Sequence, residues 1–139
     1  MRFVVAGVDA AGDSCLIEET EVPAPTAVLS AELIHQTITS PPPARAPGKS
    51  AHVDLEIPPG LARWMLVQYP AGHRTPMHHT DSIDFNTIIS GSVELLLDDG
   101  SHRFGPGDCV VVTGVDHAWL PGPEGCTASV VVIGTPPRD

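Results

Sequence analysis

Histidine and aspartate side chains gather in one short stretch of this sequence. His73, His78 and His79 lie close together, Asp84 follows them, and His117 lies further along the chain. Imidazole and carboxylate groups together suit iron, manganese, nickel, cobalt or zinc, and the same groups act as general acids and bases. The stretch therefore indicates a site for a metal ion or for proton transfer.

Short strands separated by turns must position these residues. The strand-like segments cover residues 63–69, 84–90, 92–97, 109–112, 117–120 and 126–134, and we expect breaks at Gly91 and at the PGPEG run that follows HAWL. Because side chains alternate along a strand, His78 and Thr80 should point to one face and His79 to the other. With no long amphipathic helix and no internal repeat, the pattern predicts one all-β sandwich or barrel.

The first 50 residues read differently from the rest. Residues 2–8 and 14–22 predict a β-hairpin around the turn-rich AAGD. Residues 23–50 contain a run of three prolines at 41–43, which cannot lie in a central strand, so we expect an irregular arm with one short helical turn near 30–36. The prediction is one structural domain, with the hairpin and arm in residues 1–50 and the barrel in residues 51–139.

The stretch from Gly72 to Gly91 resembles the first motif of the cupin family, G-x5-H-x-H-x3-4-E-x6-G. The spacing of Gly72, His78, Thr80, Asp84 and Gly91 fits the motif throughout. Two residue types differ, because Thr80 stands in place of the second histidine and Asp84 in place of the glutamate.

The stretch GPGDCVVVTGVDHAWLP resembles the second cupin motif, G-x5-P-x-G-x2-H-x3-N. Gly107, Gly114 and His117 match in kind, although the two glycines are one residue closer than in the motif. Val112 replaces the proline, and Pro121 stands in place of the asparagine. The chain is also similar to small single-domain bacterial cupins with an M-H-x-T-x-S-I-D core followed by H-A-W.

The resemblance implies a fold and a site. The fold is the cupin-type double-stranded β-helix, a jelly-roll barrel, and the site is a divalent metal (zinc, iron, manganese, nickel or cobalt) on His78, Asp84 and His117, which converge inside the barrel. Thr80 leaves an alternative open, in which His78 and His117 line a metal-free pocket and form hydrogen bonds. Cupins commonly pair through barrel edges, and the N-terminal hairpin could extend a partner's sheet, so we also expect a homodimer.

Further residues are candidates for roles around this site. The general-base candidates are His73 and His79, and His73 is the better substitute for the missing ligand because it lies in the entering loop. The candidates for substrate binding are Tyr69, Arg74, Thr80, Asn86 and Trp119, although Trp119 equally fits the core or a dimer contact. The remaining histidines lack a partner at useful spacing and are interpreted as surface or packing residues; they are His35, His52 and His102. Cys109 is interpreted as a buried, inert thiol.

Composition excludes several classes of partner. The net charge is −10 with seven lysines and arginines, so nucleic acid and anionic membranes are poor partners. No stretch approaches the roughly 18 apolar residues of a membrane span. The odd number of cysteines, three, and the absence of a signal-peptide pattern predict a cytoplasmic protein with reduced thiols.

Three functions follow from these observations. The first is an enzyme of the cyclase, decarboxylase, dehydratase or isomerase type, in which a divalent metal acts as a Lewis acid on a small, anionic or carbonyl-bearing metabolite. The second is a metal-dependent dioxygenase, since two histidines and one carboxylate with open positions suit iron and dioxygen. The third is a module that binds a small ligand without catalysis.

Overall fold

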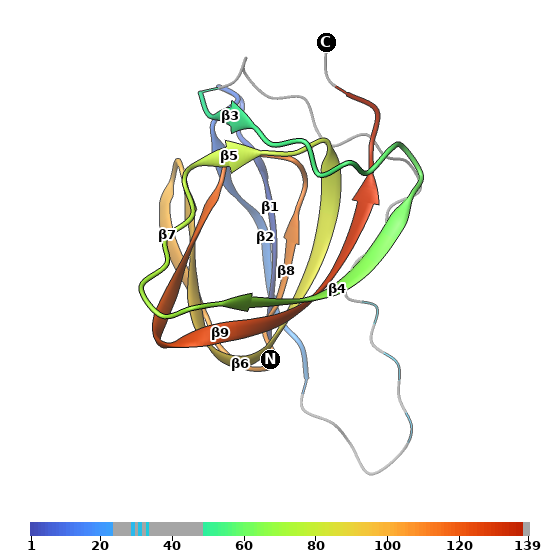
Figure 1. Ribbon diagram of the computed structural model, residues 1–139. Coiled ribbons are helices and arrows are strands. Elements are labelled where there is room, and N and C mark those ends of the chain that lie inside the picture. The colour runs from blue at the N-terminus through green and yellow to red at the C-terminus, as the bar shows by residue number, and fades with distance from the viewer. Residues whose placement is uncertain (24–28, 30, 32, 34–48, 138–139) are drawn as a thin grey trace.

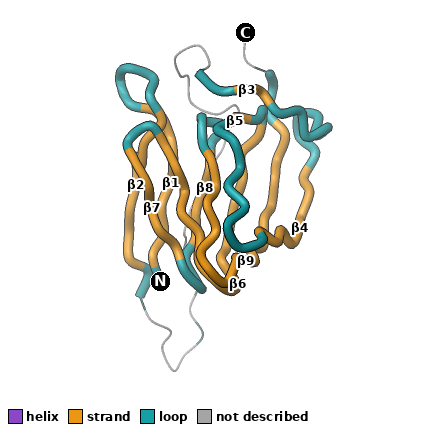
Figure 2. Tube along the Cα trace, turned by 60° about the vertical axis from the view of Figure 1, so that its left-hand side comes forward, coloured by secondary structure: helices purple, strands orange, loops and turns teal. Residues whose placement is uncertain are grey.

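The computed structural model describes residues 1–23, 29, 31, 33 and 49–137 (Figure 1). Within these residues the chain forms strands and no helix, which confirms the all-β prediction (Figure 2). The strands are β1 (Arg2–Val8), β2 (Ser14–Glu21), β3 (Ala51–His52), β4 (Ala62–Tyr69), β5 (His78–His79), β6 (Ser82–Leu97), β7 (Gly100–Phe104), β8 (Cys109–Val112) and β9 (Ala118–Gly134). The arm of residues 23–50 and its helical turn fall almost entirely outside the described residues.

Seven strands form one sheet that curls into a barrel. Their order is β2-β1-β8-β6-β9-β4, and β7 pairs with β6. The short strands β3 and β5 pair in parallel across one end of the barrel (Figure 1). An antiparallel bridge between His78 and His117 joins β5 to the chain just before β9, with both N···O distances 2.9 Å. Two histidines of the candidate site are therefore held by the same backbone contact.

The predicted N-terminal hairpin is present, and it extends the barrel's own sheet. β1 pairs antiparallel with β2 on one side and parallel with β8 on the other, where Val4 lies beside Val110. Both faces of β1 are buried. This explains why its sequence is continuously apolar rather than alternating.

At two places where the sequence predicted that a strand ends, the structure has a bend within one long strand. We predicted separate strands on either side of Gly91 and of PGPEG, but β6 continues through Gly91 and β9 continues through Gly125. Gly91 has φ 73° and Gly125 has φ 76°, and a Cβ on Gly91 would lie 2.0 Å from the carbonyl oxygen of Gly125. The glycines therefore let the two strands bend together at one point, where the register of their pairing shifts.

Apolar side chains cover both faces of the sheet. The larger cluster fills the barrel and includes Val4, Leu95, Phe104 and Val112. A second cluster lies on the opposite face of the strands, around Phe3, Val5, Ile83 and Val111. The interior cluster ends at a polar pocket near the β5 end of the barrel.

Candidate functional site

A cavity of about 160 Å³ lies inside the barrel next to the histidine bridge. Its walls come from β4, β5, β6 and β9 and from the loop before β4. Its polar residues are Tyr69, Thr75, His78, Thr80, Asp84, Asn86 and His117, and its apolar residues are Leu55, Met65, Val67, Trp119, Val130 and Val132. We call this cavity the barrel pocket.

His78 and His117 form a pair in the barrel pocket. Their ring centroids are 4.4 Å apart. The Nδ1 of His78 lies 2.8 Å from the carbonyl oxygen of Pro76, and the Nδ1 of His117 lies 2.8 Å from that of Val115. A carbonyl oxygen can only accept, so each Nδ1 carries a hydrogen, and the neutral tautomer consistent with this contact has its lone pair on Nε2.

Burial keeps His117 neutral. Its side chain is almost completely enclosed. Desolvation first, and the neighbouring His78 second, lower the pKa of His117 to about 4. At neutral pH this imidazole is therefore an acceptor, suited to a metal ion or to a hydrogen-bond donor on a ligand.

Asp84 ends a row of hydroxyl groups on the same strand face. Thr80 Oγ1 lies 2.7 Å from Ser82 Oγ, and Ser82 donates to Asp84 Oδ1 at 2.6 Å. Burial raises the pKa of Asp84 to about 6, and the hydrogen bond from Ser82 offsets part of that rise. A carboxyl with such a pKa can release and take up protons near neutral pH.

Three more predicted residues line the barrel pocket. The Asn86 amide donates to the backbone carbonyl oxygens of Val110, at 3.1 Å, and Asp84, at 3.4 Å, rather than to the Asp84 carboxylate. Tyr69 and Trp119 form an aromatic wall with ring centroids 6.1 Å apart. Burial raises the pKa of Tyr69, so its hydroxyl stays protonated and can donate to a ligand.

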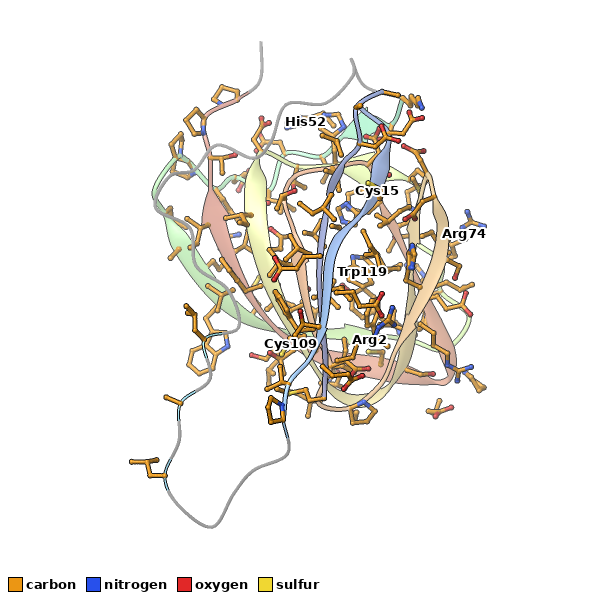
Figure 3. All side chains as sticks on the ribbon, turned by 180° about the vertical axis from the view of Figure 1, so that it is seen from behind. Arg2, Cys15, His52, Arg74, Cys109 and Trp119 are labelled. Carbon is orange, nitrogen blue, oxygen red and sulfur yellow. The ribbon has the colours of Figure 1, made fainter. Side chains whose placement is uncertain are left out.

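The remaining predicted residues lie away from the barrel pocket. His73 and Arg74 are exposed in the segment before β5, and Figure 3 shows Arg74 at the periphery and Trp119 inside the barrel. His79 lies on the opposite side of β5 from His78, as alternation predicted, and its Nδ1 is 3.2 Å from Ser50 Oγ and 3.4 Å from Asp116 Oδ1. Neither of the predicted general bases, His73 and His79, therefore lines the barrel pocket.

Two interpretations of other residues need correction. His52 and His102 do have partners, because Nε2 of His52 lies 3.1 Å from Asp81 Oδ2 and Nε2 of His102 lies 2.6 Å from Asp99 Oδ1. Both partners are brought close by folding or a turn, which strand spacing does not reveal. Cys109 is half-buried rather than buried, because its side chain lies on the outer face of β8. His35 falls outside the described residues.

The chemistry of the pocket fits a divalent ion only in part. Imidazole Nε2 atoms are typical metal ligands, and the Nδ1–H···O=C bonds of His78 and His117 fix the ring orientation as in known metal sites. Among the described residues, however, no group of three histidine, cysteine, aspartate or glutamate side chains is placed to hold a metal. The histidine pair offers two donor nitrogens, and Asp84 is not grouped with them as a third donor.

Sequence reasoning missed several residues of the pocket. Met65 and Val67 lie on the inward face of β4 in line with Tyr69, so alternation along the strand was a sufficient signal. Leu55 comes from a loop without regular spacing, and no sequence signal indicated it.

Comparisons with known proteins agree with a cupin fold. No family model matches the chain. Phomopsin biosynthesis cluster protein C′ of Diaporthe leptostromiformis is 34% identical over 71 residues, which covers 47% of this chain and 38% of that protein. A cupin-domain-containing oxidoreductase of Aspergillus ruber is 32% identical over 56 residues, covering 40% of this chain and 28% of that protein. The chain therefore spans well under half the length of these curated relatives.

Solved structures with partial similarity to the chain include a cupin. An RmlC-like cupin with a double-stranded β-helix fold from Methanocaldococcus jannaschii shares 21% sequence identity, with a TM-score of 0.46, over 57% of this chain and 74% of that one. The curled sheet of this chain itself confirms the all-β barrel that the sequence predicted. No helix in the described residues is long and apolar enough to cross a membrane.

Proposed function

We propose that this cupin is an enzyme that moves protons on a small, carbonyl-bearing metabolite held in the barrel pocket. The observation that carries the proposal is a carboxyl with a pKa of about 6, Asp84, in one pocket with the neutral imidazole of His117 and the imidazole of His78. Reactions of this kind include isomerisation, cyclisation and dehydration. Names of relatives support small-molecule biosynthesis, since they include proteins of the phomopsin and oryzines biosynthesis clusters.

Each residue of the pocket has a distinct role in this proposal. Asp84, ionised above pH 6, takes a proton from the carbon next to the substrate carbonyl and returns it at a second position. Ser82 and Thr80 orient the carboxylate through their hydrogen bonds. Tyr69 donates to the substrate oxygen, and Trp119 packs against its carbon skeleton.

A divalent metal on His78 and His117 is part of the proposal. It would supply Lewis-acid polarisation of the substrate oxygen. The support for the metal is the pair of Nε2 atoms of His78 and His117. Because Nδ1 of each ring donates to a backbone carbonyl oxygen, a metal ion on the two Nε2 atoms would be the group that polarises the substrate oxygen. Asp84 was predicted as the third ligand; because its Oδ1 accepts from Ser82 and it is not grouped with the histidines, we assign it the proton-transfer role instead.

Exchange of carbon-bound hydrogen tests the role of Asp84. The wild-type protein, as isolated, is incubated in D2O with acetone, pyruvate or acetoacetate, and deuterium incorporation is followed by NMR. We expect catalysed exchange with at least one compound, rising from pH 5 to pH 7 as Asp84 ionises, and a loss of about 100-fold or more in Asp84→Asn. Asp98→Asn is the matched control. Catalysed exchange that Asp84→Asn leaves unchanged would contradict the role of Asp84, and no catalysed exchange in the wild type would favour the non-catalytic ligand-binding module.

Elemental analysis tests the metal. We expect about one divalent ion per chain in the wild type, loss of that ion in His78→Ala and in His117→Ala, and retention in Asp84→Ala and in the control His102→Ala. Loss in Asp84→Ala would restore Asp84 as a ligand. Equal metal content in all variants would contradict the assignment of the metal to His78 and His117.

A dioxygenase is the second function, because one relative is named a cupin-domain-containing oxidoreductase. The wild-type protein, reconstituted anaerobically with iron(II), would then consume oxygen in the presence of a carbonyl compound that is active in the exchange experiment. A redox-inert metal together with no oxygen uptake would rule out this second function.

A further inference from the structure

A second cavity, of about 210 Å³, lies beside the barrel pocket. The loop of residues 52–59 covers it on one side, and the corner between β5 and β6 and the end of β9 form the other side. Leu55 and Thr80 line both cavities, so the two share a wall. His52 of β3 lines the second cavity, which therefore lies at the β3 end of the barrel (Figure 3).

The floor of the second cavity holds a hydroxyl group without a partner. Thr135 lines the cavity and is 1% exposed, yet its Oγ1 forms no hydrogen bond in the described structure. Its backbone N–H, in contrast, donates to the carbonyl oxygen of Asp81 at 3.0 Å. A buried hydroxyl that gives up water without gaining a partner costs stability, and such groups call for an explanation.

Negative charge surrounds that floor. Asp54 and Asp81 both line the cavity, and within the described residues Asp54 forms no ion pair and accepts only the N–H of Glu56, at 2.8 Å. Asp81 contacts one imidazole, that of His52. These residues form no group able to hold a metal ion. The chemistry therefore favours an organic cation that also offers N–H donors.

The wall of the cavity is preformed. The Arg63 guanidinium donates to the carbonyl oxygens of Leu55, at 3.2 Å, and Glu56, at 3.5 Å. The loop also packs directly on β9, since a Cβ on Gly134 would lie 2.2 Å from the carbonyl oxygen of Pro58. A ligand would therefore meet a shaped site rather than a loop that it must order.

We propose that the second cavity binds the ammonium group of a small organic molecule, with Thr135 accepting one N–H and Asp54 and Asp81 balancing the charge. This proposal does not rest on the reaction assigned to the barrel pocket. Three donors on a compact ammonium match one hydroxyl and two carboxylates.

NMR titration of the ¹⁵N-labelled protein tests the binding. The probes are propylammonium chloride, sodium propionate, 1-propanol and sodium chloride, all at matched ionic strength. We expect propylammonium alone to give saturable shifts at the amides of Asp81 and Thr135, with a dissociation constant on the order of millimolar for so small a probe. Asp54→Asn and Thr135→Val should each weaken binding about five-fold. The control Asp99→Asn, which removes the carboxylate from the contact with His102, should not.

Thermal unfolding supplies a second, independent readout. Thr135→Val removes a hydroxyl without a partner, so the melting temperature of the free protein should stay the same or rise. Thr113→Val is the matched control, because the Thr113 hydroxyl is buried and donates to the carbonyl oxygen of Ala6 at 2.7 Å, and this variant should melt at a lower temperature. The proposal is overturned if propionate, propanol or sodium binds as well as propylammonium, or if both valine variants lose stability equally.

Discussion

The pKa of Asp84 is raised and the pKa of His117 is lowered within the same barrel pocket. Burial favours the neutral form of each side chain, which for Asp84 is the protonated acid and for His117 is the deprotonated base. Between about pH 4 and pH 6 the folded protein therefore keeps a proton on Asp84 that the unfolded chain releases. Over nearly the same range the folded protein lacks a proton on His117 that the unfolded chain binds.

These shifts predict opposite slopes of stability against pH. More protons bound in the folded state make stability fall as pH rises, so Asp84 lowers the free energy of unfolding between about pH 4 and pH 6. Fewer protons bound make stability rise with pH, so His117 raises it between about pH 4 and pH 6.5, by up to about 3 kcal/mol. In the wild type the two effects largely offset each other.

Single substitutions should separate the two slopes. In chelator-treated protein, Asp84→Asn leaves the His117 effect, so stability should rise steadily from pH 4 to pH 6.5. His117→Gln leaves the Asp84 effect, so stability should fall from pH 4 to pH 6. Urea unfolding at half-unit pH steps measures both, with His102→Gln as the control for an exposed histidine–aspartate pair. Parallel curves for the two variants would show that the pocket does not shift these groups as described.

At the scale of elements, the long strands β6 and β9 depend on the contact between Gly91 and Gly125. Gly91→Ala places a Cβ against a backbone carbonyl oxygen and puts alanine at a positive φ, so we expect a loss of at least about 2 kcal/mol in the free energy of unfolding. Urea unfolding measures this loss. Gly105→Ala is the control, because a Cβ there meets open space at an ordinary φ, and a similar loss in that variant would show that neither the close approach nor the positive φ matters.

Apolar runs and alternation both predicted elements well. β8, a continuous apolar run, matches the expected span of residues 109–112, and β4, in which every second residue is partly buried, differs from 63–69 by one residue. The glycines and prolines at 91 and 121–125 are local signals common to turns and to bends, so the sequence could not show that β6 and β9 continue through them.

The same reasoning explains the outcome for the two cavities. Strand positions placed His78, Thr80, Asp84 and Asn86 along the barrel pocket, because their spacing repeats every second residue. Loops follow no such repeat. Where a loop folds back onto the barrel decides whether its residues reach a cavity. This is why the sequence did not reveal that His73 lies away from the barrel pocket, or that residues 52–59 line a second cavity.

At the scale of the whole molecule, the outer face of the sheet carries an apolar row. The register places Trp64 of β4 beside Val131 of β9, Val131 beside Phe85 of β6, and Phe85 beside Val111 of β8. Trp64 is 79% exposed and Leu66 on the same strand is 68% exposed. Within the described residues β4 is an edge strand that pairs on one side with β9. Such an edge is a ready surface for a second chain.

The homodimer expected from the sequence should therefore form through β4. A two-fold contact would set Trp64 and Leu66 of one chain against the same residues of its partner and remove both from water. We expect light scattering to give twice the chain mass of 14.6 kDa. Trp64→Glu and Leu66→Glu should each shift the protein to monomer, because a charge on that face opposes its burial. Ile17→Glu, on the exposed face of β2, is the control and should leave the dimer intact. A wild type that is monomeric, or a Trp64→Glu variant that remains dimeric, would place the contact elsewhere or remove it.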